Sequence, residues 1–339
     1  MRTCWVLDHP AHVRLLTGQL QTSKTRDIIV ATRRPEVEKM LATSEGILPR
    51  REIIWVERPV GKAKRRKALQ RLRTVKKVFK DALRNGMPVQ RVVSIGAPLE
   101  HWAHASIRKH RGSSYERWYI SDTEINHLAH TLAKKYATDV VIPTHWDSSL
   151  DGGFEASVGC RIHRIDGLHG HIHLKPQLKS KHVRNPPHIL VRRLLGDGHH
   201  DEDEIIPLPS TAWDGCDVTF VDEEHGIEDP WKLDSMLSSS DGVITQSVTM
   251  ASEAVILGTP TLLVSRAKRG FLDRLERDGA PLFRWQKPCE GDEWLNLKAQ
   301  FLAGIHLTDA LEEMPWPEAL NQFNALFTAD VEEQTTQHQ

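Results

Sequence analysis

The chain has 339 residues, and its 45 Lys and Arg residues balance 45 Asp and Glu residues, so the formal net charge is zero. This balance gives no support to a general nucleic-acid-binding protein, and we expect no specific nucleic-acid partner. Hydrophobic residues make up 39% and charged residues 27%, which permits a buried core and excludes compositional disorder.

Size and cysteine content narrow the class further. The length favours two domains, and no apolar run reaches the roughly 20 residues that a membrane-spanning helix needs. The cysteines Cys4, Cys160, Cys216 and Cys289 are far apart and form no C-x-x-C pair. They are typical of free thiols, so we expect a cytoplasmic protein without a disulfide framework.

Short apolar runs alternate with helical patterns through the first half of the chain. This rhythm predicts a parallel, doubly wound α/β sheet. The predicted strands are 4–7, 27–31, 52–56, 91–95, 117–121 and 139–143. A long basic helix is predicted over 61–85, and Gly86 provides a good stop signal.

A Gly- and Ser-rich segment, 147–159, is interpreted as the connection between two domains. The expected division is a first domain over 1–150, a second over 160–305, a closing helix over 306–328 and a polar tail over 329–339. Predicted strands of the second half are 161–165, 188–192, 204–207, 217–221, 241–244 and 261–264. Predicted helices there are 231–238, 250–257, 270–277, 293–303 and 316–327.

The segment TQSVTMASEAVILGTP, residues 245–260, indicates a tight loop that leads into a helix. Small and hydroxyl residues let a phosphate approach the amides at a helix start, where Ser247 and Thr249 would contact it. Simple N-capping is the alternative for these two residues. The Glu253 carboxylate could accept hydrogen bonds from two ribose hydroxyls at once. The alternative is that Glu253 is a solvated helix residue without a ligand.

Further candidates follow other predicted strands. His12 could serve as a base or as a donor to a phosphate, with Asp8 ordering its loop. Asp122 and Glu124 could act as a general base on a sugar hydroxyl. The alternative is that their segment, SDTE at residues 121–124, caps the start of a helix. Arg192, at a strand end, could pair with phosphate oxygens.

Two histidine-rich segments, 169–173 and 199–200, raise the question of a metal site. Alternating histidines can chelate zinc. No other type of metal-ligating residue lies at a spacing typical of metal-binding motifs, so the sequence predicts no metal centre.

The basic helix predicted over 61–85 has two faces. Apolar residues recur on one face at helical spacing, which predicts contact with the core. The other face is dense in Lys and Arg. It is either solvated or a contact surface for anionic lipid headgroups or a phosphorylated lipid acceptor, at the inner face of a membrane.

Five segments, in the same order along the chain, resemble the archaeal and bacterial domain of unknown function family 354. They begin at Trp5 (WVLDHPAHVRLL), Tyr119 (YISDTEINHLAHTLAKKYATDVVIPTHW), Arg164 (RIDGLHGHIHLKP), Ile189 (ILVRRL) and Thr245 (TQSVTMASEAVILGTP). That family is similar in fold to UDP-N-acetylglucosamine 2-epimerases and MurG-type glycosyltransferases. The resemblance therefore implies a GT-B-like α/β fold, with two Rossmann-like domains facing each other across a cleft.

The resemblance also implies a function. We expect a glycosyltransferase-like protein that uses a nucleotide-diphosphate sugar, UDP-linked, as substrate and needs no further cofactor. The acceptor would be a lipid-linked sugar or a glycan. The implied residues are His12, Asp122 and Glu124 for catalysis, and Arg192, Ser247, Thr249, Glu253 and His171 for the nucleotide sugar.

The chain departs from the family pattern in three places. Residues 245–248 stand where the family has glycines, and His169-Gly170 replaces a Lys-Glu pair, so one carboxylate is missing. The family's Pro-Arg after its next strand appears here as Pro207-Leu208-Pro209-Ser210. These departures leave two alternatives open. One is a 2-epimerase-like enzyme, and the other is a non-catalytic GT-B scaffold that binds a partner or an anionic surface through the basic helix.

Overall fold

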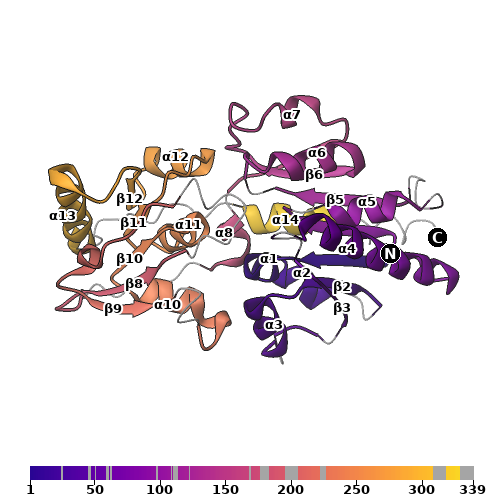
Figure 1. The fold of residues 1–339 in the computed structure, drawn as a ribbon, viewed down its shortest axis with the longest axis horizontal. Helices are drawn as coiled ribbons and strands as arrows, with labels where there is room; N and C mark the ends of the chain where they lie inside the picture. The colour runs from indigo at the N-terminus through magenta and orange to yellow at the C-terminus, as the bar shows by residue number, and fades with distance from the viewer. Residues whose placement is uncertain are drawn as a thin grey trace. The chain divides into compact units, whose positions relative to one another are not determined.

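In the computed structural model the chain forms two compact units (Figure 1). Unit 1 contains Met1–His173 and Glu318–Gln339, and unit 2 contains Leu174–Pro317. The structure describes residues 1–23, 26–44, 47–49, 51–58, 61, 63–96, 98–107, 109, 114–121, 123–167, 169–175, 183–194, 205–221, 227–307 and 318–328.

Unit 1 is built on a seven-stranded parallel sheet in the order β3-β2-β1-β4-β5-β6-β7. The strands are β1 (Thr3–Leu7), β2 (Ile28–Thr32), β3 (Glu52–Val56), β4 (Arg91–Ile95), β5 (Glu116–Ile120), β6 (Asp139–Pro143) and β7 (Arg161–Ile165). The runs TCWVL and RVVSI are buried along their whole length, as expected for strands covered on both faces. The strand order reverses between β1 and β4, which makes this the topological switch point of unit 1.

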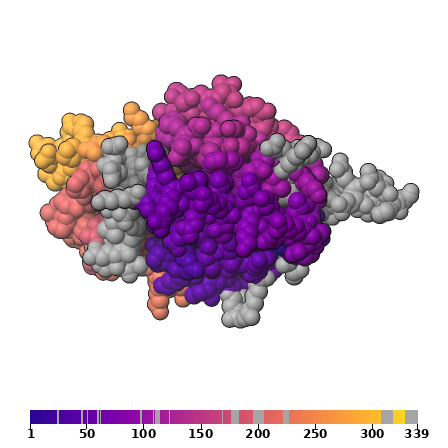
Figure 2. All heavy atoms as spheres, turned by 45° about the vertical axis from the view of Figure 1, so that its right-hand side comes forward, coloured from indigo at the N-terminus to yellow at the C-terminus, as the bar shows by residue number. Residues whose placement is uncertain are grey.

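Helices cover both faces of this sheet. They are α1 (Pro10–Leu15), α2 (Thr17–Thr22), α3 (Pro35–Ala42), α4 (Lys64–Arg84), α5 (Leu99–Ala105), α6 (His127–Tyr136), α7 (Phe154–Ser157), α8 (His169–His173) and α14 (Ala319–Thr328). The purple segment that includes α4 lies at the surface of unit 1 (Figure 2).

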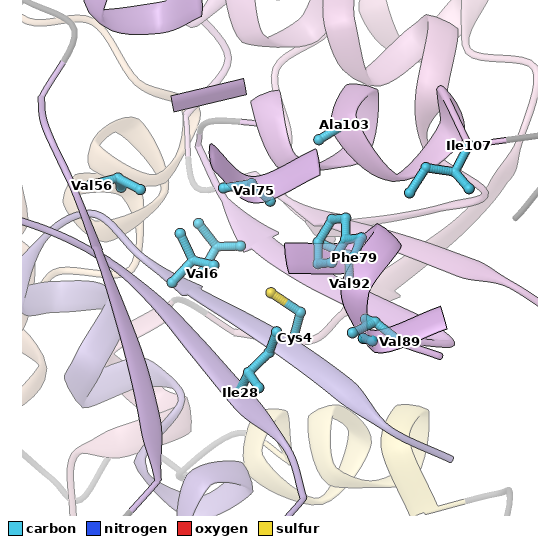
Figure 3. Packing of buried hydrophobic residues seen from close by; sticks show 12 residues of the cluster. Cys4, Val6, Ile28, Val56, Val75, Phe79, Val89, Val92, Ala103 and Ile107 are labelled. Atoms are coloured by element: carbon cyan, nitrogen blue, oxygen red, sulfur yellow. The ribbon is translucent and has the colours of Figure 1, made fainter. Parts of the chain in front are cut away.

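Alternate side chains of β1 show how the two faces are covered. Cys4 and Val6 join the same buried cluster as Val75 and Phe79 of α4 (Figure 3). Trp5 points to the other face and meets Phe327 of α14 edge-on, with ring centroids 5.9 Å apart. The period-2 alternation of a strand thus buries one set of side chains under α4 and the other under α14.

Unit 2 has a five-stranded parallel sheet in the order β12-β11-β10-β8-β9. Its strands are β8 (His188–Arg192), β9 (Asp217–Phe220), β10 (Gly242–Thr245), β11 (Thr261–Val264) and β12 (Leu282–Trp285). Its helices are η2 (Ser210–Trp213), η3 (Pro230–Lys232), α10 (Leu233–Ser239), α11 (Val248–Ile256), α12 (Gly270–Arg277) and α13 (Gly291–Leu307). Residues of α13 pack on one face and residues of α10 and α11 on the other, and the order reverses between β8 and β10.

The division of the chain differs from the expected boundary at 150–160. Residues 161–165 form β7, which pairs with β6 and therefore belongs to unit 1. The Gly- and Ser-rich segment is an ordered turn, because the Asp151 carboxylate accepts from the amides of Gly153, Phe154 and Glu155 at 2.7–3.0 Å. Trp146 Nε1 donates to the same carboxylate at 2.9 Å.

Two details of unit 2 also differ from the sequence expectations. No strand forms over the described part of 204–207, where Ile205 makes a single bridge to Ser265 and Glu204 lies outside the described residues. The strand β12 was not predicted. Among the helices that the structure describes, none combines the length and the apolar character needed to cross a membrane.

Candidate functional site

The turn between β10 and α11 in unit 2 presents helix amides at the switch point. Ser247 is the N-cap of α11, and its hydroxyl accepts from Met250 N–H at 3.4 Å, which confirms the capping interpretation. The Ser247 amide itself donates to Thr245 Oγ1 at 2.9 Å. The amides of Val248 and Thr249 donate to no acceptor within the described part of the chain. Two donors at the positive end of a helix can therefore receive an anion.

Arg192 lies beside this turn, on the other side of the switch point. It is the register partner of Thr245, and its carbonyl accepts from Gln246 N–H at 3.1 Å. The guanidinium donates to the Val221 carbonyl at 3.1 Å, which ties it to the end of β9. A cationic residue and two helix amides thus lie at the carboxyl ends of two neighbouring strands, where open α/β sheets bind their ligands, and groups of these kinds suit phosphate oxygens.

Glu253 lies further along α11 and is only 3% exposed, whereas Thr249 is exposed. The alternative of a solvated helix residue is therefore wrong for Glu253. The helix ends at Ile256, and Gly258 follows its C-cap Leu257 with a φ of +76°, the left-handed conformation that glycine adopts at low cost.

Gln246, one of the residues that replace the family glycines, has a structural role that the sequence did not reveal. Its side chain is buried, donates through Nε2 to the Ile206 carbonyl at 2.5 Å, and accepts from Leu194 N–H at 2.8 Å. Thr245 is also buried. Both side chains are therefore directed into unit 2, and the approach to the amides of α11 does not depend on glycine at these positions.

In unit 1, a buried ion cluster stands at the switch point between β1 and β4. Arg71 Nη2 donates to both carboxylate oxygens of Asp8, at 2.8 and 3.0 Å, and Arg71 Nε donates to Glu100 Oε1 at 2.6 Å. Thr32 Oγ1 donates to Asp8 at 2.5 Å. The Arg71 side chain is 2% exposed and Glu100 is fully buried. One cation therefore compensates two acids away from water.

The pKa values of these acids move in opposite directions. Burial opposes ionisation of Asp8, but the charge of Arg71, with His12 and the Thr32 hydroxyl, outweighs it and lowers the pKa of Asp8. Burial, with repulsion from Asp8, raises the pKa of Glu100 against the attraction of Arg71. Burial likewise disfavours the Arg71 cation, but Asp8 and Glu100 together raise its pKa.

His12 is held by the same loop. The Asp8 amide donates to His12 Nδ1 at 3.2 Å. Because Nδ1 accepts this hydrogen bond, the neutral ring carries its proton on Nε2. His12 therefore presents an N–H donor, and of the two roles predicted for it, the geometry suits the donor to a phosphate or hydroxyl oxygen.

The remaining candidates follow β5 and β7. Glu124 is 1% exposed and its Oε1 accepts from Asp147 N–H at 3.2 Å, while Asp122 lies outside the described residues. The capping alternative for SDTE is wrong, because α6 begins at His127 with Asn126 as its N-cap. Burial, with the neighbouring His145, lowers the pKa of His171 in α8 to about 4, so this ring is neutral at pH 7.

Comparisons with known proteins resolve the fold. No protein-family model and no curated protein matches the chain. Among solved structures, a protein from Listeria monocytogenes assigned as a UDP-N-acetylglucosamine 2-epimerase superposes with a TM-score of 0.61 at 12% identity. That alignment covers 96% of this chain and 94% of that chain. The UDP-GlcNAc 2-epimerase from Neisseria meningitidis, bound to UDP-GlcNAc, gives 0.56 at 12% identity, covering 96% and 98%.

The third comparison is with MurG from Acinetobacter baumannii, with a TM-score of 0.52 at 12% identity, covering 96% of this chain and 99% of that chain. The chain has the GT-B fold. The expectation of two Rossmann-like sheets is thereby confirmed. At this identity the likeness establishes the GT-B architecture, and the chemistry must be argued from the residues.

No group of three or more His, Cys, Asp and Glu side chains is arranged to hold a metal ion in the part of this GT-B chain that the structure describes. Residues 199–200 lie outside that part. His169 and His173 lie one helical turn apart on α8, where His173 Nδ1 and the His169 carbonyl are 3.1 Å apart.

A second buried histidine in unit 1 makes stability depend on pH. His130 stacks on Phe154 with ring centroids 4.1 Å apart, and its Nε2 lies 3.1 Å from Ser121 Oγ. Burial, with the neighbouring His127, lowers its pKa to about 4. The unfolded chain therefore binds this proton first as the pH falls, so folding stability is lost between the ordinary pKa, about 6.5, and 4.

We expect the free energy of unfolding, measured with urea, to decrease from pH 7 to pH 4.5. His130→Phe keeps the ring stack and removes the titrating group. It should therefore reduce the slope of the unfolding free energy against pH by the equivalent of about one proton. The exposed His306→Phe, on α13 of unit 2, serves as the control and should leave the dependence unchanged. If the unfolding free energy had the same slope against pH in His130→Phe and in the unmodified protein, His130 would not be the source of the pH dependence.

Proposed function

We propose that this GT-B protein binds a nucleotide-diphosphate sugar, UDP-linked, at the switch point of unit 2 and transfers the sugar to an acceptor. The observation that carries the proposal is that Arg192 ends β8 and that the amides of Val248 and Thr249 begin α11 just after the neighbouring strand β10. Helix amides and a guanidinium stabilise a leaving diphosphate without a metal ion.

Glu253 supplies the second half of the recognition. It would accept hydrogen bonds from the ribose hydroxyls, with Ser247 and Thr249 beside the phosphates. Two solved proteins of the same fold support the choice of nucleotide: MnaA from S. aureus was solved with UDP, and the N. meningitidis epimerase with UDP-GlcNAc. The five resembling segments further support membership of family 354.

Unit 1 would supply the acceptor side. His12 would donate Nε2–H to an oxygen of the acceptor or of the transferred sugar, because Asp8 N–H occupies Nδ1. Asp122 and Glu124 remain our candidates for the general base, and His171 remains a candidate contact of the sugar nucleotide. A neutral ring at position 171 would offer one donor and one acceptor at pH 7.

Isothermal calorimetry with UDP, UDP-GlcNAc, GDP-mannose and dTDP-glucose tests the binding step. We expect UDP and UDP-GlcNAc to bind more tightly than GDP-mannose and dTDP-glucose. The absence of heat with all four would contradict the proposal. Binding of a UDP sugar without transfer to any lipid-linked or glycan acceptor would instead support the non-catalytic scaffold.

A 2-epimerase is the second candidate, favoured by one observation. The higher TM-scores belong to 2-epimerases, 0.61 and 0.59, against 0.52 for MurG. An epimerase exchanges the proton at C2 of the sugar, so incubation with UDP-GlcNAc in heavy water, without acceptor, would place deuterium at C2. We expect no deuterium there, because Gly170 stands where the family has a carboxylate.

A further inference from the structure

Helix α4 has a second surface that neither the core nor the proposed sugar-nucleotide site uses. Ten of its 21 residues are Lys or Arg, and Asp81 is its one acid. Arg71, Val75, Phe79 and Ala82 form the buried stripe of the helix. The other cations therefore lie on the sides of the helix that are exposed or partly exposed to solvent.

Most of these cations lack a compensating charge. The side chains without a hydrogen bond or ion pair in the described part of the chain are Arg65, Arg66, Lys67, Arg73, Lys76, Lys77 and Lys80. Arg84 pairs with Asp81 at 3.1 Å. Like charges three and four residues apart repel on a helix, and cations in its first turn oppose the helix dipole. An anionic partner would relieve both effects.

Apolar side chains lie beside these charges. Among the described residues, the exposed large hydrophobic side chains are Leu69, Met87, Leu128, Leu295 and Leu320. Leu69, 48% exposed, lies on α4 at helical spacing from Arg66 and Arg73, and Met87, 53% exposed, follows the helix.

This composition favours a lipid surface over a nucleic acid. The one aromatic residue of α4, Phe79, is fully buried, so the exposed face offers no ring on which a base could stack. A basic face with scattered aliphatic side chains is instead typical of helices that lie in a membrane interface. Twenty-one residues give a straight contact about 30 Å long.

We propose that the outward face of α4 docks unit 1 on an anionic phospholipid surface. The docking face consists of the side chains of Arg65, Arg66, Leu69, Arg73, Lys77 and Lys80. This proposal rests on the charge and the solvent exposure of side chains in unit 1. It goes beyond the proposed function because it does not require nucleotide binding in unit 2.

Vesicle sedimentation of the full chain tests this docking. We expect the protein to sediment with vesicles of phosphatidylcholine and phosphatidylglycerol and to stay in solution with phosphatidylcholine alone. Raising the salt from about 0.1 M to about 1 M, which shortens the Debye length from about 10 Å to about 3 Å, should release it. The variant Arg73→Glu, Lys77→Glu, Lys80→Glu should lower the partition constant by at least about tenfold.

A control of equal net charge separates the docking face from overall charge. Lys135→Glu, Lys268→Glu and Arg277→Glu change three exposed cations outside α4, and this variant should sediment like the unmodified protein. If the reversed variant fails to fold, Arg73→Gln, Lys77→Gln, Lys80→Gln provides the same comparison. Equal losses in test and control variants, no binding to anionic vesicles, or tighter binding to a DNA duplex than to vesicles would each overturn the proposal.

Discussion

Replacing Arg71 with methionine is expected to destabilise the protein by about 3–5 kcal/mol, the usual consequence of removing one partner from a buried ion cluster. Arg71 is the cation that joins Asp8 to Glu100, and the change leaves two carboxylates in a site with little access to water. Methionine preserves much of the side-chain volume, so the loss measures charge compensation more than packing.

Urea unfolding at pH 7 and pH 4 provides the measurement. Asp8, with its lowered pKa, adds stability above its unfolded pKa and loses it on acidification, while the raised pKa of Glu100 acts in the opposite direction. In Arg71→Met neither carboxylate has a compensating charge. Protonation of these carboxylates at pH 4 should therefore reduce the loss of unfolding free energy relative to the unmodified protein. Arg73→Met, an exposed neighbour, should stay within about 0.5 kcal/mol. A deficit that is the same at both pH values would contradict this account.

Replacing Glu253 with alanine is expected to weaken the binding of a UDP sugar by about 10- to 100-fold. A hydrogen bond to a charged group contributes about 1.5–3 kcal/mol, and a carboxylate can accept two from a ribose. Glu253→Gln keeps the shape and one acceptor oxygen and should show an intermediate loss. Calorimetry with UDP-GlcNAc measures both.

The controls for Glu253 separate binding from folding. Glu290→Gln removes an exposed acid elsewhere in unit 2 and should leave the affinity unchanged. Because Glu253 is buried, urea unfolding should accompany each titration, so that only folded protein is compared. A Glu253→Ala variant that is folded and binds UDP-GlcNAc with unchanged affinity would remove this residue from the site.

The strands were the most predictable part of the fold. A parallel strand covered on both faces is a continuous apolar run, as in TCWVL and RVVSI, and such runs can be recognised without knowledge of their partners. β12 was missed because LFRW is four residues long and includes Arg284, which pairs with Asp273 and Glu276 of α12. β7 was placed in the wrong unit because glycines and serines stand before it.

The candidate site was predictable only where its contacts are local. The Ser247 cap spans three residues and follows from residue type, whereas Gln246 bonds to a carbonyl forty residues away. Arg71 was grouped with the other cations of the basic helix. Its position four residues before Val75 and eight before Phe79 places it on the buried stripe, and this spacing was the available signal.

Helix α14 has a consequence for the synthesis of the chain. Phe327 packs against Trp5 and Trp118 of unit 1, yet it follows the whole of unit 2 in the sequence. At the pace of a ribosome, unit 2 takes on the order of ten seconds to emerge. During that interval the two tryptophans of the nascent sheet lack this covering ring, so the first half of the protein must wait for its last helix before its fold is closed.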